Sequence, residues 1–172
     1  MKYHPLLRIT HWLMGVCILG LIALGWYMGT VTPENGKYAL YGWHKSFGML
    51  LIFLFPVRFI LRKTTAIPPL PADIKPVEKK LSHLTHILLY VGMILVPVSG
   101  YLMSLSGGHE VKMFGLHMPN LIEKDKVIGD ITHEIHEISP YVLLGLVALH
   151  IAGALKHKFF EKPENDVLNR MI

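Results

Sequence analysis

The segment His133–His157, HEIHEISPYVLLGLVALHIAGALKH, decides the fold that this sequence predicts. Between His136 and His150 lies an apolar run, residues 138–149, which a serine and a proline interrupt only near its start. Acidic residues precede this run and lysines follow the segment. An uncharged apolar stretch of this length is typical of a helix that crosses a membrane. The segment therefore predicts a membrane-spanning helix that carries two histidines.

The spacing of these two histidines suggests what they do. His136 and His150 are fourteen residues apart, which is two heptads. In a left-handed helical bundle this spacing returns both side chains to the same inward seam. At a rise of about 1.5 Å per residue they would lie roughly 21 Å apart, one near each membrane surface. An imidazole inside a bilayer needs a partner, and haem iron is a suitable one.

The composition also indicates a membrane protein. Of the 172 residues, 52% are hydrophobic and only 17% are charged, whereas soluble domains carry about 25% charged residues. The net charge of +5 comes mostly from basic residues at predicted helix ends, so it indicates membrane orientation and no nucleic-acid partner. The single cysteine, Cys17, lies in an apolar run, and no CxxCH motif for covalent haem attachment is present.

Four apolar segments predict an all-α fold without strands, an integral membrane four-helix bundle in a single domain of residues 1–172. The proline-rich connector at 66–80 is expected to be extended, and residues 106–130 to form the longest polar loop. The amino-terminal span superficially resembles a signal peptide, but without a convincing cleavage site we expect it to be retained. The spans are predicted at approximately 6–28, 41–61, 84–105 and 136–157.

The basic residues are unequally divided between the two sides of this predicted bundle. Four spans place both termini and the central connector on one side of the membrane. Twelve of the 17 lysines and arginines lie on that side and five on the other. Because cytoplasmic loops carry an excess of Lys and Arg, we predict that both termini face the cytoplasm.

With this topology the histidines form groups of equal depth. His11 and His150 lie near the inner ends of their spans. His44 and His136 lie near the outer ends. Each pair would join two helices across the bundle interior, where helical bundles build cofactor sites. Two imidazoles fill both axial positions of a haem iron, which favours electron transfer over oxygen binding. We therefore predict two haem sites, with the pairs His11–His150 and His44–His136.

Other side chains compete for roles at these sites. His133 lies three residues before His136 on a similar helix face, and we prefer His136 because of its register with His150. His83 and His86, near the inner end of the third span, could be further ligands or could contact a haem propionate or a quinone. Arg58 and Arg62, near the inner end of the second span, could contact a propionate or a quinone or could be topology anchors.

The acidic residues argue against two other functions. The sequence HEIHE is not the HExxH pattern of zinc proteases, because Glu137 occupies the position of the second histidine. A proton pump or transporter would usually carry carboxylates inside its spans, and the predicted spans contain none that lies away from their ends.

A series of motifs along the chain resembles the bacterial cytochrome b561 family, whose members are four-helix cytochromes of the inner membrane. The motifs run in order from one end of the chain to the other. They are RITHWLM at 8–14, WHKSFG at 43–48, PVRFILR at 56–62, LSHLTHILLY at 81–90, PVSGYLMS at 97–104, FGLHMP at 114–119, HEIHE at 133–137 and VALH at 147–150.

The resemblance implies two haem b groups with His11, His44, His136 and His150 as axial ligands. It also implies a multi-pass protein of the bacterial inner membrane that oxidises periplasmic superoxide and passes the electrons to ubiquinone. Relatives serve instead as quinone-facing subunits of hydrogenases and formate dehydrogenases or as partners of secreted proteins. The expected partners are thus the lipid bilayer, a quinone, and a small anionic donor or a periplasmic redox protein. The alternative function is an electron-transfer or anchor subunit without its own substrate site.

Overall fold

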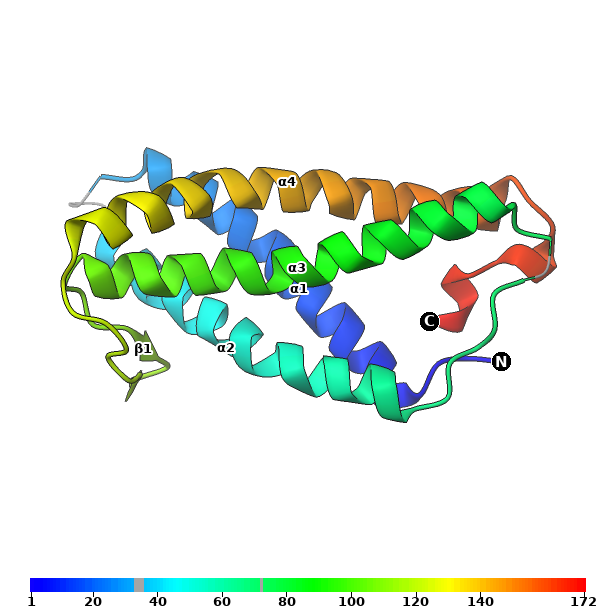
Figure 1. Cartoon of the computed structure of the whole chain (residues 1–172), viewed down its shortest axis with the longest axis horizontal. Coiled ribbons are helices and arrows are strands. Elements are labelled where there is room, and N and C mark those ends of the chain that lie inside the picture. Colours follow the sequence, from blue (N-terminus) through cyan, green and yellow to red (C-terminus); the bar gives the residue numbers. More distant parts are fainter. Residues whose placement is uncertain (33–35, 72) are drawn as a thin grey trace.

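Four long helices make up most of the computed structural model, which describes residues 1–32, 36–71 and 73–172 (Figure 1). Each helix contains a stretch long and apolar enough to cross a membrane. The predicted all-α membrane bundle is therefore confirmed. The helices are α1 (Pro5–Thr30), α2 (Lys37–Thr64), α3 (Pro76–Ser106) and α4 (Lys126–Phe159).

All four helices begin earlier than predicted, and two of them, α3 and α4, do so by eight residues or more. α3 begins at Pro76, so the prediction of an extended connector is wrong for residues 76–80. Proline is tolerated there because the first turn of a helix has no partner for its N–H. α4 begins at Lys126, inside the predicted polar loop, because the Asp125 side chain accepts a hydrogen bond from the backbone N–H of Ile128 and caps the helix.

A short β-hairpin interrupts the connection between α3 and α4. Its strands, β1 (Lys112–Met113) and β2 (Leu116–His117), pair antiparallel. The turn between them holds Phe114 at φ 49° and Gly115 at φ 91°, and two-residue hairpin turns favour this left-handed conformation. The prediction of a chain without strands is wrong here, because strands of two residues are too short to produce a periodic pattern.

The helices are arranged as two pairs, α1 with α2 and α3 with α4. Within the described residues α2 also contacts α3, whereas α1 and α4 make little direct contact. Figure 1 shows α1 crossing the bundle obliquely and both chain termini at the same end, which we call the termini end. The opposite end, beside β1, is the hairpin end. Side chains of α4 and of the α1–α2 pair meet in the interior between the two helix pairs.

The bundle buries few of its apolar side chains. The central core cluster consists of Met14, Ile18, Ile22, Leu51 and Leu143. In the most apolar 18-residue stretch of α4, only 6% of the residues are buried inside the bundle. The remaining apolar surface is available to lipid and to the interior between the helix pairs.

The chain after α4 folds back against the termini end. Two short 3-10 helices, η2 (Pro163–Asn165) and η3 (Leu168–Arg170), form this tail. Trp12 of α1 donates from its indole Nε1 to the Met171 carbonyl at 2.9 Å. The backbone N–H of Tyr3 donates to the Arg170 carbonyl at 3.0 Å. The tail is therefore fastened to the beginning of the chain.

Candidate functional site

Two pairs of histidine rings face each other in the interior of the bundle. His44 of α2 and His136 of α4 lie at the hairpin end, with ring centroids 6.1 Å apart and ring planes at 87°. His11 of α1 and His150 of α4 lie toward the termini end, with ring centroids 6.0 Å apart. The structure thus brings together the same two pairs that depth along the sequence predicts. Each histidine pair joins α4 to one helix of the α1–α2 pair.

Hydrogen bonds fix the orientation of His136. Its Nδ1 lies 2.8 Å from the Val96 carbonyl oxygen, which can only accept, so this nitrogen carries the proton. The Ser99 hydroxyl lies 3.3 Å from the same nitrogen. The lone pair of the neutral ring is then on Nε2. A histidine that binds a metal typically donates its other ring N–H to a carbonyl in this way.

Gly100 of α3 makes room for the His136 ring. A Cβ atom at this position would lie 2.6 Å from Cε1 and 2.9 Å from Nδ1 of His136. Any side chain larger than hydrogen would therefore displace the ring. The partner histidine, His44, has a buried Nδ1 without a hydrogen-bond partner among the described residues. A buried polar atom of this kind usually has a partner, which is consistent with a ligand at this position.

A cavity of about 550 Å³ surrounds the hairpin-end pair. His44, His136, Gly25 and Gly100 line it, together with mostly apolar side chains of all four helices. This volume is within the range of small-molecule and cofactor sites, about 300–1,000 Å³. The apolar lining would exclude water and keep the imidazoles neutral.

The surroundings of the termini-end pair are more polar. Arg58 of α2 donates from Nη2 to His11 Nδ1 at 3.0 Å and from Nη1 to the Leu7 carbonyl at 3.0 Å. His86 of α3 lies with its ring centroid 5.1 Å from that of His150. The His86 Nδ1 donates to the Ser82 carbonyl at 2.6 Å. Three histidines from three helices and one arginine therefore meet at this level.

The remaining predicted contacts lie outside these two clusters. Arg62 lies over the ring of Tyr3, 5.6 Å from its centroid. His83 is exposed on α3. His133, the alternative to His136, is exposed and lies 3.7 Å from the Glu137 carboxylate. Of the four predicted propionate or quinone contacts, the structure thus places only Arg58 and His86 beside a histidine pair.

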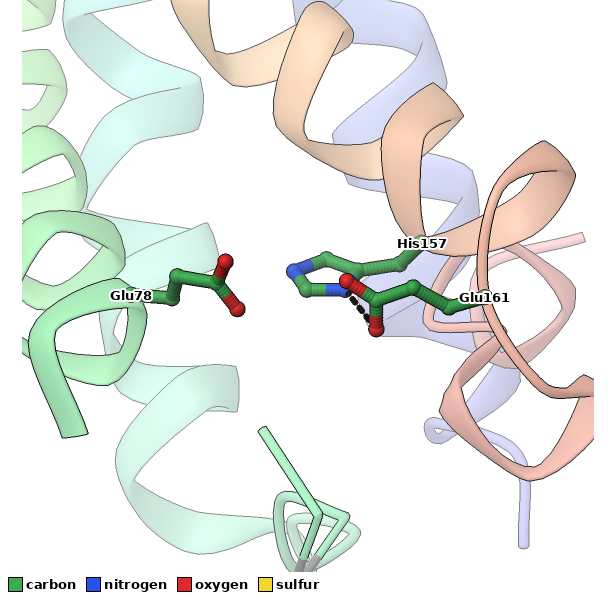
Figure 2. A group of neighbouring side chains, drawn as sticks. All are labelled: Glu78, His157 and Glu161. Atoms are coloured by element: carbon green, nitrogen blue, oxygen red, sulfur yellow. Dashed lines mark hydrogen bonds and ion pairs between the residues drawn. The ribbon is translucent and has the colours of Figure 1, made fainter. Parts of the chain in front are cut away.

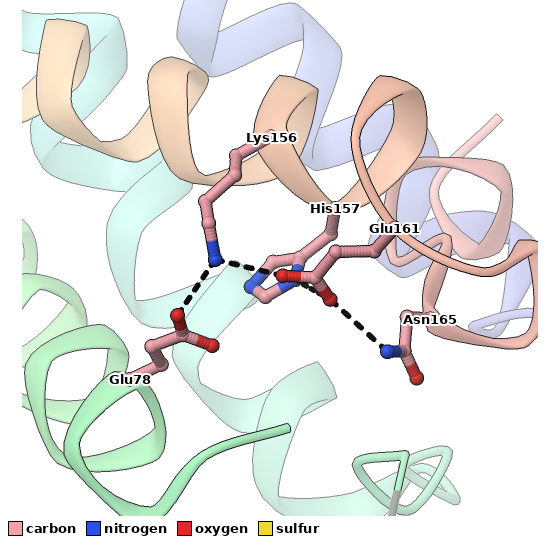
Figure 3. A network of polar contacts seen from close by, with 5 residues as sticks. All are labelled: Glu78, Lys156, His157, Glu161 and Asn165. Carbon is pink, nitrogen blue, oxygen red and sulfur yellow. Dashed lines mark hydrogen bonds and ion pairs between the residues drawn. The ribbon is translucent and has the colours of Figure 1, made fainter. Parts of the chain in front are cut away.

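A polar network that the sequence did not predict lies at the termini end (Figures 2 and 3). Figure 3 shows the Lys156 ammonium between two carboxylates, 2.6 Å from Glu78 and 2.7 Å from Glu161. Glu161 also accepts from His157 Nδ1 at 2.8 Å and from the Asn165 amide at 3.0 Å. The i,i+4 spacing of His157 and Glu161 was the sequence signal for this contact. The network joins the ends of α3 and α4 to the tail.

The same side chains resemble a metal site in their arrangement. Figure 2 shows Glu78, His157 and Glu161 converging, and their ligand atoms lie within 4.8 Å of one another. However, the Lys156 ammonium already contacts both carboxylates and supplies the positive charge that a cation would bring. The hydrogen bond from Lys156, and then that from His157, lowers the pKa of Glu161 to about 2. We therefore interpret this group as an ion-pair clasp.

The chain matches a family model described as prokaryotic cytochrome b561 over residues 2–172. This chain belongs to the prokaryotic cytochrome b561 family. The resemblance that the sequence motifs suggested is thereby confirmed. Members of the cytochrome b561 family are membrane electron-transfer proteins that bind haem b. The chain is accordingly a bacterial membrane cytochrome.

Three relatives within the cytochrome b561 family illustrate its range. "Cytochrome b561 homolog 2" of Escherichia coli (strain K12) is 29% identical over 174 residues, covering 99% of this chain and 91% of the relative. "Probable superoxide oxidase CybB" of Yersinia pestis is 24% identical over 173 residues, covering 99% and 96%. "Cytochrome b561 homolog 1" of Escherichia coli (strain K12) is 25% identical over 132 residues, covering 74% and 72%.

The ring separation in both histidine pairs fits the haem of a cytochrome b561. Two imidazoles on opposite sides of one metal ion place their ring centroids roughly 6 Å apart, because each nitrogen lies about 2 Å from the metal. The observed separations of 6.0 and 6.1 Å agree with this requirement. The 5.1 Å separation of His86 and His150 is shorter. The His44 Nδ1, which has no hydrogen-bond partner in the part of the chain that the structure describes, adds to the fit at the hairpin end.

Proposed function

We propose that this protein is a di-haem b membrane cytochrome that oxidises a donor on one side of the membrane and reduces ubiquinone. The strongest support is that two histidines of α4, at different levels of the bundle, each face a histidine of another helix. Haem b, when bound, supplies reversible one-electron chemistry at iron. The residues that would hold the two haems are His11 and His150 at the termini end and His44 and His136 at the hairpin end.

The surrounding residues prepare these ligands. Val96 holds the proton of His136 on Nδ1 and so leaves Nε2 for iron. Arg58 lies beside the termini-end pair, where a propionate or a quinone carbonyl would find a hydrogen-bond donor. His86 lies beside His150 with its Nδ1 proton already donated to the Ser82 carbonyl. Because more basic residues lie at the termini end and in the central connector, we place that end in the cytoplasm and the hairpin end in the periplasm.

Superoxide is the donor that we propose first. Two superoxide anions would each lose one electron and leave as dioxygen, and one ubiquinone would take up the two electrons and two protons to become ubiquinol. Lys37 and Lys45 line the hairpin-end cavity, and positive charge around such a cavity would raise the rate of anion capture. A 24% identical relative carries the name "Probable superoxide oxidase CybB", which supports this choice.

The acidic residues at the hairpin end favour a second candidate function. His133, Glu134 and Glu137 form an exposed group there, and Glu137 lines the same cavity as the two lysines. These carboxylates would repel a small anion. In the second function the chain carries electrons for another redox protein, or anchors it, and has no substrate site of its own.

Stopped-flow mixing of the oxidised, purified protein with superoxide separates the two functions. The first function predicts that the haem bands of the reduced state appear faster than in a soluble bis-histidine haem protein mixed under the same conditions. A Lys45→Gln variant with full haem content should react more slowly, whereas Lys79→Gln at the termini end should react at the original rate. Reduction no faster than in the soluble control would leave the second function.

Haem content tests the ligand assignment independently of the donor. His44→Ala and His150→Ala should each lose one of two haems and retain the other, as measured by the optical spectrum and by haem extracted per polypeptide. A wild-type protein with a single haem, or a variant that keeps both, would contradict the two-pair assignment.

A further inference from the structure

The turn of the β1–β2 hairpin exposes two large apolar side chains that the redox chemistry does not use. Phe114 is 51% exposed and Leu116 is 66% exposed. Exposed apolar side chains that lie next to one another usually contact a partner or a membrane. We call the residues from Phe114 to Leu116 the hairpin tip.

The hairpin lies beside the bundle rather than beyond its end, as Figure 1 shows. The Ser46 hydroxyl of α2 fixes it there, because it accepts from the backbone N–H of Phe114 at 3.0 Å and lies 3.3 Å from the Lys112 carbonyl. Ser46 follows the first residue of α2 by nine positions, or about 13 Å along the helix axis. After Lys45, α2 carries no charged residue until Arg58. The hairpin tip is therefore level with the beginning of the uncharged part of α2.

Aromatic rings continue from the hairpin tip onto the outside of α2. The Phe114 ring packs edge-to-face on Phe47 at 5.2 Å and lies 6.4 Å from Trp43. Trp43 is itself 57% exposed. Tryptophan and other aromatic residues gather at the boundary between lipid tails and headgroups. The tip thus extends an aromatic surface that already belongs to a membrane-spanning helix.

The opposite end of the hairpin is polar. Glu110 lies 3.5 Å from Lys112 and 3.3 Å from His117, and all three side chains are exposed. Val111, by contrast, is buried in a cluster with Met49 and Tyr101. The hairpin therefore packs on α2 and α3, with apolar residues at its tip and charged residues at its base.

We propose that the hairpin tip inserts into the lipid at the headgroup boundary of the leaflet on the hairpin side. The occupant is bilayer lipid, because the tip is continuous with the lipid-facing surface of α2 and has the polarity gradient of an interfacial anchor. Since Ser46 follows His44 by two positions, this contact fixes the depth of the hairpin-end histidine pair below the membrane surface. The proposal depends on the membrane fold and is independent of the electron donor.

Site-directed spin labelling of the full-length protein in liposomes tests this contact. Single cysteines replace Phe114 or Leu116 in a Cys17→Ala background, and each carries a nitroxide. The lipid-facing control is Phe53→Cys on α2, where the side chain is 50% exposed, and the aqueous control is Glu123→Cys in the same connection. We expect labels at the tip to collide with oxygen as at 53, and several-fold less with a water-soluble nickel complex than at 123.

Two outcomes would overturn the proposal. The first is access of the nickel complex to 114 and 116 equal to that at 123. The second is dipolar broadening between tip labels of different molecules, which would show that a second copy covers the tip. Haem spectra verify that each labelled protein is folded. If Phe114→Cys disturbs the contact with Phe47, the Leu116 label decides, because that variant keeps the Phe114 ring on Phe47.

Discussion

The two histidine pairs are similar in ring separation but differ in the direction of their hydrogen bonds. At the hairpin end, His136 donates from Nδ1 to the Val96 carbonyl, so its Nε2 is free for a metal. At the termini end, His11 Nδ1 accepts from the Arg58 guanidinium, which can only donate. A neutral His11 then carries its proton on Nε2.

This difference indicates that the hairpin-end site is prepared for iron, whereas the termini-end site must adjust. For His11 to bind iron through Nε2, Arg58 has to release Nδ1, and the guanidinium then becomes available to an anionic group such as a propionate. His86 is already in the other tautomer, with Nδ1 donating to the Ser82 carbonyl. The termini-end site therefore offers two candidate partners for His150, and the hairpin-end site offers one for His44.

The largest effect is expected from the two candidates at the termini end. His11→Ala should lose one haem completely, whereas His86→Ala should keep both, because only the His11–His150 separation of 6.0 Å matches two ligands of one iron. Haem per polypeptide and the low-temperature optical spectrum measure this. The opposite result would make His86 the ligand and Arg58 the permanent partner of His11.

A smaller but selective effect is expected at the hairpin end from Gly100→Ala. The added methyl group would lie 2.6 Å from His136 Cε1, and overpacking of this kind costs about 1–3 kcal/mol. We expect a weakened or lost hairpin-end haem and an unchanged termini-end haem in the optical spectrum. Gly145→Ala on α4 is the control, because a Cβ atom there would meet nothing within 4 Å among the described residues. Equal haem loss in both variants would refute a specific role for Gly100.

Removal of the charge at the termini end should change a redox potential without loss of haem. Arg58→Gln removes a positive charge beside His11, so the termini-end haem should become harder to reduce by on the order of tens of millivolts. The hairpin-end haem should keep its potential. Lys63→Gln serves as the control, since the Lys63 ammonium lies over the Phe59 ring, 5.6 Å from its centroid. Potentiometric titration followed optically measures both haems, and equal shifts in the two would contradict the assignment.

The smallest effect concerns the ion-pair clasp and its pH dependence. Hydrogen bonds from Lys156 and His157 lower the pKa of Glu161 from 4.5 to about 2. Glu161 therefore adds stability above about pH 4.5 that is lost as the pH falls through its folded-state pKa of about 2. Glu161→Gln should lower the melting temperature slightly at pH 7 and flatten its decline in acid. Glu164→Gln in the same tail is the control, and an identical acid decline in both variants would argue against the clasp.

Much of this molecule follows from patterns that a linear sequence can carry. Four uncharged apolar runs predict four helices, and the separation of His136 and His150 by two heptads predicts one histidine at each end of α4. Depth along the spans was enough to match His11 with His150 and His44 with His136. The family motifs gave the expected cofactor. These features depend on position along single helices, which hydropathy and periodicity report directly.

The sequence failed where contacts join distant segments or very short elements. The β1–β2 hairpin escaped prediction because its strands are two residues long. The Lys156 clasp escaped because Glu78 is 78 residues away and enters only when α3 packs along α4.

The membrane class, the four helices and the depth of each histidine can be predicted from the sequence, because they depend on local hydrophobicity and a fixed rise per residue. The packing of the helices is needed to show which ring nitrogen of His136 carries the proton, why position 100 is glycine, and that Arg58 and His86 reach the termini-end pair. These depend on distances of a few ångströms between different helices, and only the packing of the helices sets such distances.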